Sequence, residues 1–159
     1  MPGLAALNKG QNAQVNSVSC ASAGNCVAGG YYSEKNGRTQ GFVAVERNGR
    51  WGKATRVPGL AALNKGGRPA AVNSVSCTRT GRCVAGGFYT DRSRHRQGFV
   101  TSEHNGRWGS PIPLPGLAAL NTRGSAQVGS VWCAAGSCAA GGAYTGRSGR
   151  YQGFVTQAR

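Results

Sequence analysis

The segment Pro-Gly-Leu-Ala-Ala-Leu-Asn occupies residues 2–8 and returns at residues 58–64 and 115–121. Each copy is followed by Ser-Val-x-Cys, then by Cys-x-Ala-Gly-Gly and then by Gln-Gly-Phe-Val. A module of this length, copied in tandem, cannot bury its apolar face alone and must stack on its neighbours. The sequence therefore predicts a single repeat domain of three units. The units cover residues 2–57, 58–114 and 115–159.

The stretches between these motifs are short and rich in valine, and Asn-Gly dipeptides at residues 48–49 and 105–106 are typical of tight hairpin turns. We therefore predict that each unit is a four-stranded antiparallel meander. Its Leu-Ala-Ala-Leu-Asn stretch is long enough for one helical turn. The third unit ends at Arg159, so we expect it to lack its last strand. The strands expected in the first unit cover residues 14–20, 26–32, 40–46 and 50–57.

A meander followed by a long crossover is the arrangement of a β-propeller blade. The sequence accordingly predicts an all-β fold of propeller-blade type. β-Trefoils and β-prisms also have three-fold internal repeats and stay as alternatives, although the order of hairpins suits them less well. Three blades are too few to close a ring, because propellers have about four to eight. We expect two copies of the chain to self-associate into six blades, or the open edge of the third unit to be completed by further sequence of a longer array.

A known class of repeats shares several motifs with the first unit: Ser17-Val18-Ser19-Cys20, Cys26-Val27-Ala28-Gly29-Gly30, Gly41-Phe42-Val43 and Asn48-Gly49-Arg50-Trp51. Over its whole length the chain resembles the Cys-paired tandem repeats of actinobacterial secreted or multidomain proteins, whose units look like propeller blades. In architecture it is similar to small β-propeller lectins that assemble a ring from short chains. The resemblance implies the fold and names no ligand.

The charge of the chain is strongly positive. Nineteen Lys and Arg residues face four Asp and Glu residues, which gives a net charge of +15. Such a surface attracts nucleic acids, heparin-like glycans, anionic lipids and wall polymers, although solvated arginines in turns would also serve solubility. No stretch approaches the roughly 20 apolar residues of a membrane helix, so we expect no membrane insertion.

The cysteines form close pairs, each bracketing a short polar loop between two expected strands. Facing residues of a hairpin lie within disulfide reach, so we predict one bridge per unit, with reduced buried thiols as the alternative. The pairs are Cys20 with Cys26, Cys77 with Cys83, and Cys133 with Cys138. Disulfides indicate an oxidising compartment and hence a secreted or cell-surface protein. A zinc site is disfavoured, because no pair has two-residue spacing and His95 and His104 both lie in one unit.

The residues needed for catalysis are scarce. Glu46 and Glu103 occupy the same repeat position beside a hairpin turn, where pairing with a nearby Arg47 or Arg50 is the ordinary explanation. His95 and His104 are expected in solvated loops, and no phosphate-binding or calcium-binding loop is present. We therefore predict a protein that binds without catalysis and without a metal or other cofactor.

Arginine-rich loops and neighbouring aromatic residues supply the candidate binding surface. In a propeller, the loops between second and third strands emerge on the same face as the crossovers. The candidates are Tyr31, Tyr32, Arg38, Trp51, Phe88, Tyr89, Arg92, Arg94, Arg96, Trp108, Trp132, Tyr144, Arg147 and Arg150. Trp51 and Trp108 could offer a platform for a sugar ring, but packing between blades is the simpler interpretation. Trp132 replaces Ser19 and Ser76 of an otherwise constant motif and is a weaker pointer to a site.

These observations predict a glycan-binding, lectin-like module with equivalent sites on a repeat scaffold. One alternative is polyanion binding by the arginine-rich loops, with a sulfated glycan favoured over nucleic acid because an oxidised secreted protein rarely meets DNA. A second alternative is a structural or protein-interaction scaffold, either a fragment of a longer natural array or an engineered chain.

Overall fold

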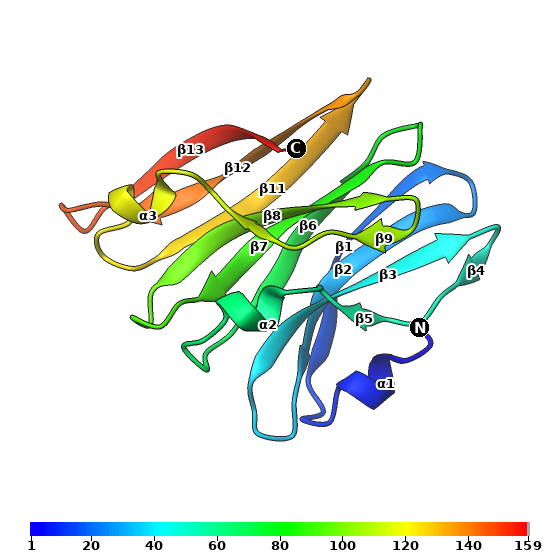
Figure 1. Ribbon diagram of the computed structural model, residues 1–159, viewed down its shortest axis with the longest axis horizontal. Coiled ribbons are helices and arrows are strands. Elements are labelled where there is room, and N and C mark those ends of the chain that lie inside the picture. The colour runs from blue at the N-terminus through cyan, green and yellow to red at the C-terminus, as the bar shows by residue number, and fades with distance from the viewer. Residues whose placement is uncertain (159) are drawn as a thin grey trace.

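The computed structural model describes residues 1–158, and its strands form three antiparallel sheets, one for each predicted unit (Figure 1). The first unit contains α1 (Leu4–Leu7), β1 (Ala13–Ser22), β2 (Asn25–Ser33), β3 (Thr39–Arg47), β4 (Arg50–Trp51) and β5 (Thr55–Arg56). The second contains α2 (Leu60–Leu63), β6 (Ala71–Cys77), β7 (Cys83–Thr90), β8 (Arg96–His104), β9 (Arg107–Trp108) and β10 (Ile112–Pro113). The third contains α3 (Leu117–Leu120), β11 (Ala126–Ala134), β12 (Ser137–Thr145) and β13 (Tyr151–Ala158).

The predicted all-β fold of tandem meanders is confirmed, and so is the single helical turn in each crossover. The expected fourth strand is instead two short strands. Gly52 interrupts it, and its N–H donates to the carbonyl of Val45 at 2.8 Å, after which β5 returns to pair with Phe42 and Val43 of β3. Within residues 1–158 the third sheet has only β11, β12 and β13, as the sequence predicts.

The sheets stack face to face, and the two larger apolar clusters lie between them, with a smaller cluster around Tyr32 and Phe42 inside the first unit (Figure 1). Val27 and Val43 of the first unit pack in one cluster with Val72 and Val75 of the second. Val84 and Val100 of the second unit pack in the same way with Val128 and Val131 of the third. The stack is open, and residues 1–158 do not close a propeller ring.

Two adjacent glycines in each second strand make this stacking possible. The methyl groups of Val72 and Val75 press on Gly29, where a Cβ would lie 2.5 Å from the nearest Val72 methyl carbon. The neighbouring Gly30 faces a β-bulge at Asn16, and a Cβ there would overlap the carbonyl oxygen of Gln14. The repeated Gly-Gly motif is therefore explained by two separate close approaches, one to the next sheet and one to the bulge.

The asparagine that ends each crossover ties neighbouring units together. Asn64 donates its Nδ2 to Gln40 Oε1 of the preceding unit at 3.4 Å, and its Oδ1 accepts from the N–H of Thr90 at 3.0 Å. Asn121 likewise donates to Gln97 Oε1 at 3.3 Å. Both asparagines are buried. The repeated asparagine of the crossover and the repeated glutamine of Gln-Gly-Phe-Val are therefore partners across the junction between units.

Each predicted cysteine pair forms a disulfide between facing residues of the first two strands of its unit. The Cα atoms lie 3.9 to 4.1 Å apart. No free cysteine remains in the described chain. A domain held by three disulfides is compatible with an extracellular location.

Candidate binding surfaces

The two ends of the stack differ in chemistry. We call the crossover end the one that carries α1, α2, α3 and the turns at residues 34–38, 91–95 and 146–150 (Figure 1). We call the hairpin end the one that carries the disulfides and the turns at residues 48–49 and 105–106. The crossover end holds more than half of the 19 Lys and Arg residues of the chain. Its exposed cations are Lys9, Lys35, Arg38, Lys65, Arg68, Arg92, Arg94, Arg123, Arg147 and Arg150.

The backbone of the crossover end is fixed by tight turns that repeat in every unit. Glu34 donates its N–H to the carbonyl of Arg38 at 2.8 Å, and Asp91 donates its N–H to the carbonyl of His95 at 2.9 Å. Gly146 makes the same bond to Arg150 at 3.3 Å. The basic side chains therefore project from loops whose main chain is already ordered.

Neighbouring units share this surface. The guanidinium group of Arg38 lies against Gly67 in the crossover of the second unit, and the imidazole of His95 lies against Gly124 in the crossover of the third. The turn of one unit and the crossover of the next thus meet, and Arg68 directly follows the glycine that Arg38 contacts. The result is one basic surface running along the stack rather than separate charged loops.

The acidic residues of the crossover end are already engaged. Glu34 forms an ion pair with Arg56, with an N–O distance of 3.1 Å. Asp91 accepts hydrogen bonds from the N–H of His95 at 2.9 Å and from Gln97 Nε2 at 3.0 Å. Neither carboxylate pairs with an exposed cation of the turns in the described residues, so these cations keep their charge available to a ligand.

Several of the predicted aromatic ligand contacts lie in the core. Tyr32, Phe88 and Tyr89 are buried, and Tyr31 is half-buried and donates its hydroxyl hydrogen to Gln14 Oε1 at 3.3 Å. Tyr144 is also half-buried and packs against the second core cluster. The prediction did not separate these rings from the exposed arginines, because both faces of the middle sheet are covered and strand alternation carries no signal there.

Arg96 differs from the other candidate arginines. Its guanidinium carbon lies 4.0 Å from the centre of the Phe88 ring, and its Nη1 donates to Gln127 Oε1 of the third unit at 3.4 Å. Its carbonyl accepts from Asn121 Nδ2 at 2.8 Å. Arg96 therefore belongs to the junction between the second and third units, whereas Arg38, Arg92, Arg94, Arg147 and Arg150 are exposed.

The tryptophans also fall into two groups. Trp108 packs against the core cluster shared by the first and second units, whereas Trp51 packs against a cluster that lies inside its own unit, so only Trp108 lies between units. Trp108 Nε1 is buried without a hydrogen-bond partner in the described chain. Trp132, in contrast, is 68% exposed on the uncovered face of the third sheet. Only Trp132 offers a freely exposed indole.

Burial shifts the acidity of two tyrosines beneath the crossover end. Burial raises the pKa of Tyr32 to about 12, with Arg56 lowering it and Glu34 raising it by smaller amounts. Burial also raises the pKa of Tyr89, and the negative charge of Asp91 adds to the rise. Both phenols are therefore neutral at physiological pH and contribute no charge to the surface.

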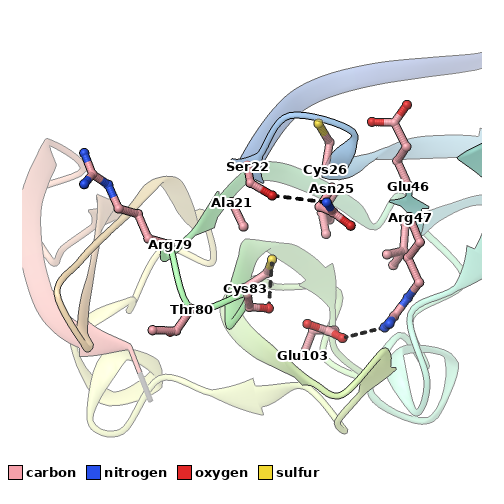
Figure 2. A pocket seen from close by; sticks show the side chains of 13 residues that line it. Ala21, Ser22, Asn25, Cys26, Glu46, Arg47, Arg79, Thr80, Cys83 and Glu103 are labelled. Atoms are coloured by element: carbon pink, nitrogen blue, oxygen red, sulfur yellow. Dashed lines mark hydrogen bonds and ion pairs between the residues drawn. The ribbon is translucent and has the colours of Figure 1, made fainter. Parts of the chain in front are cut away.

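A cavity lies at the hairpin end, between the first and second units (Figure 2). Its volume is about 210 Å³, which is below the range of about 300 to 1,000 Å³ usual for ligand pockets. Arg47 pairs across it with the buried Glu103 at 3.7 Å, and Glu103 also accepts from the N–H of Gly106. The Glu46 carboxylate points away from this pair in Figure 2. The cavity therefore encloses a link between units, with no converging pair of free carboxylates.

A second hollow of about 610 Å³ lies at the equivalent junction between the second and third units. It is lined by Cys77, Thr78, Arg79, Thr80, Cys133, Ala134, Ala135 and Gly136. Arg79 is the only charged residue among them, and none is aromatic. Neither hollow therefore has the aromatic platform and converging polar groups that a pyranose ring needs.

The described residues offer neither a metal site nor a membrane-spanning helix. No group of three or more His, Cys, Asp or Glu side chains could hold a metal ion there. No helix within residues 1–158 is both long and apolar enough to cross a membrane. No protein-family model matches the chain, and no curated protein matches it.

Sequence reasoning missed the residues that join the units. Asn16 and Asn73 sit at β-bulges and donate their Nδ2 to the carbonyls of Val72 and Val128 in the following unit, at 2.7 and 2.8 Å. The signal was present, because these asparagines recur at the repeat spacing. Their role was not visible, because a bulge redirects a side chain in a way that strand alternation does not predict.

Proposed function

We propose that this protein is a secreted, non-enzymatic binding module for anionic glycans, and that the crossover end holds the ligand. The observation that carries the proposal is the basic surface of that end. Exposed cations recur there in each unit. Glu34 is paired with Arg56, and Asp91 accepts hydrogen bonds from Gln97 and from the backbone of His95. Carboxylate or sulfate groups spaced along a glycan would meet several guanidinium groups at once.

The burial of the candidate rings favours an anionic glycan over a neutral one. Recognition of a neutral sugar needs an aromatic face for the apolar side of the ring. Tyr32, Phe88 and Tyr89 are buried, so no such face recurs at the crossover end of every unit. Arginine forks can instead hold an acidic sugar by charge-assisted hydrogen bonds.

The disulfides favour a glycan over a nucleic acid. Each unit contains one bridge, and bridges of this kind persist in oxidising compartments, where sulfated and carboxylated glycans are common and nucleic acids are rare. Tandem units further suit a ligand that repeats along its length, because several weak contacts then add in one complex.

The proposal is tested by binding to an array of neutral glycans, anionic glycans, heparin and duplex DNA, at physiological salt and at several-fold higher salt. We expect binding to sulfated or carboxylated glycans that falls by orders of magnitude as salt rises. Salt-resistant binding to a defined neutral sugar would contradict the charged-surface mechanism. Equal binding to DNA would contradict selectivity for glycans, and no binding at all would favour a structural or protein-binding scaffold.

A further inference from the structure

The junctions between units follow one pattern. Gly29 of the first unit receives Val72 and Val75 of the second, and Gly86 of the second unit receives Val128 and Val131 of the third. A Cβ at either glycine would lie only 2.5 Å from the nearest of these valine methyl carbons, so only glycine fits. Each unit thus presents a glycine face on one side and a valine face on the other.

Hydrogen bonds repeat with the same register. Ser17 Oγ accepts from the N–H of Val75 at 3.1 Å, and Ser74 Oγ accepts from the N–H of Val131 at 3.1 Å. The asparagine of each crossover donates to the glutamine of the preceding unit, as described above for Asn64 and Asn121. The register of one unit on the next is therefore specified by polar groups as well as by shape.

The outer face of the first sheet and the outer face of the third sheet expose the unmatched halves of this pattern. We call the valine face the uncovered surface of the first unit around Val15 and Val18, and the glycine face the uncovered surface of the third unit around Gly141 and Val155. Val18 is 54% exposed, whereas its equivalents Val75 and Val131 are each 5% exposed. Val155 is 82% exposed, whereas Val43 and Val100 are 0% and 3% exposed.

The polar partners are unmatched as well. Asn8 Nδ2 has no hydrogen-bond partner among the described residues, although its equivalents in the other crossovers donate to a glutamine. Gln152, the glutamine that would accept from it, is exposed in the third unit. Ser17 and Ser74 each accept a hydrogen bond from a valine N–H of the following unit. Ser130 is the equivalent serine of the third unit, and the equivalent valine N–H is that of Val18 in the first unit.

We propose that the valine face of one copy of this chain docks on the glycine face of a second copy, head to tail. In this complex Val15 and Val18 of one copy lie on Gly141 of the other, whose would-be Cβ has no neighbour closer than 3.6 Å in the single chain. A second copy is the occupant that fits, because each copy carries both complementary faces and the geometry continues the junctions already present within the chain.

Two substitutions make the new junction more apolar than the internal ones. In the third unit, Gly129 stands in place of the bulge asparagine, and Trp132 stands in place of a serine. In the first two units that serine, Ser19 or Ser76, accepts from the N–H of Cys77 or Cys133 at 3.0 Å. The junction between copies therefore lacks two of the hydrogen bonds of the internal junctions and contains a large apolar side chain, which is exposed in the single chain. In the internal junctions the serine Oγ lies 3.0 Å from a backbone nitrogen, so the larger Trp132 ring fits only where this end of the junction opens locally, and there it would meet the Cys20–Cys26 disulfide of the other copy.

A head-to-tail contact closes into a ring or grows into a filament, depending on the rotation between copies. Two copies supply six units, which lies within the range of about four to eight blades found in propellers. We therefore expect a closed dimer rather than an open chain of copies.

The test is the mass of the protein in solution, measured by sedimentation over a wide concentration range without ligand. We expect a species of twice the 16.3 kDa chain mass. Val18→Asp, which places a charge on the valine face, and Gly141→Leu, which fills the glycine face, should each give the single-chain mass. Ile112→Asp, a change at another exposed apolar residue that belongs to neither face, is the matched control and should stay a dimer.

Mixing the two defective variants distinguishes a head-to-tail contact from a symmetric one. The Val18→Asp variant keeps an unchanged glycine face, and the Gly141→Leu variant keeps an unchanged valine face. One of the two junctions in a mixed dimer is therefore intact, so dimers should reappear in the mixture. Circular dichroism should show that each variant is folded. A single-chain mass for the unchanged protein at all concentrations would overturn the proposal, as would a dimer that survives both substitutions or a mixture that stays monomeric. A larger assembly with the same dependence on the variants would overturn the six-blade stoichiometry.

Discussion

Single residues of this chain are held in conformations or surroundings that their type does not favour. The Tyr32 hydroxyl is buried without a hydrogen-bond partner in the described residues, beneath Arg56, whose guanidinium carbon lies 6.0 Å from the centre of its ring. Gln11 has a φ of 60°, a left-handed conformation that Gly67 and Gly124 adopt at the equivalent positions of the other crossovers. Each of these positions costs stability that a single substitution can recover.

The Tyr32 hydroxyl should ionise only at strongly alkaline pH, and its ionisation should then destabilise the fold. Its folded pKa of about 12 lies above the ordinary value of 10.0. The stability linked to its neutral form is fully present below pH 10, and it is lost as pH rises from about 10 to about 12, by roughly 2 to 3 kcal/mol in all. Ultraviolet titration of the phenolates should show a step near pH 12 that Tyr32→Phe removes. Ionisation of every tyrosine near pH 10 would contradict this assignment.

Gln11→Gly should stabilise the protein. A non-glycine residue in the left-handed region costs about 1 to 2 kcal/mol, and glycine relieves this strain at some cost in chain entropy. We expect the free energy of unfolding in urea to rise by about 1 kcal/mol. The reciprocal change Gly67→Gln should lower it, because Gly67 has a φ of 64°. Equal stability of all three proteins would show that Gln11 is not strained.

At the scale of strands and sheets, the junction between units is the structural element that the chain repeats. Gly86 accepts two valine side chains from the third unit, and Ser76 accepts from the N–H of Cys133 at 3.0 Å. Gly141 occupies the same place in the third sheet without a covering unit. The two glycines therefore have the same sequence context and different surroundings, which makes them a matched pair.

Gly86→Ala should destabilise the protein, and Gly141→Ala should not. A Cβ at Gly86 would lie 2.5 Å from a Val128 methyl carbon, and overpacking of this kind costs about 1 to 3 kcal/mol. A Cβ at Gly141 meets only the Phe154 carbonyl oxygen, at the ordinary distance of 3.6 Å. Urea unfolding at a protein concentration low enough to prevent association measures both. Similar losses of stability would show that sheet propensity, not the junction, governs these sites.

The order of strands could be predicted from the sequence because every motif recurs, and the Asn-Gly turns fixed the hairpins. The single fourth strand was wrong because Gly52 breaks it, at a place where the sequence offered only a short polar run. The candidate site was predicted less well. Phe88 and Tyr89 are neighbours on one strand and both are buried, since sheets cover the middle unit from both sides. Only the three-dimensional stack separates these core rings from the exposed arginines.

At the scale of the whole molecule, one end of the stack is basic and the other end is closed by disulfides, short turns and the Arg47–Glu103 ion pair. If two copies dock as proposed, their crossover ends form one ring of basic loops. A long anionic glycan would then contact more units than a single chain can offer, which raises its apparent affinity although the affinity of each unit is unchanged. Association of the chain and glycan binding are measured separately, so either proposal can fail alone.

The most direct test compares two triple variants that lose equal charge at opposite ends. Arg92, Arg94 and Arg147 are exposed at the crossover end, and Arg50, Arg79 and Arg107 are exposed at the hairpin end. Affinity for a sulfated glycan is measured with each set changed to Gln, over a range of salt concentrations. The crossover-end variant should lose most of its affinity and show a weaker dependence on salt, while the hairpin-end variant stays close to the unchanged protein. Equal losses in both variants would contradict the account, because net charge rather than the crossover end would then govern binding.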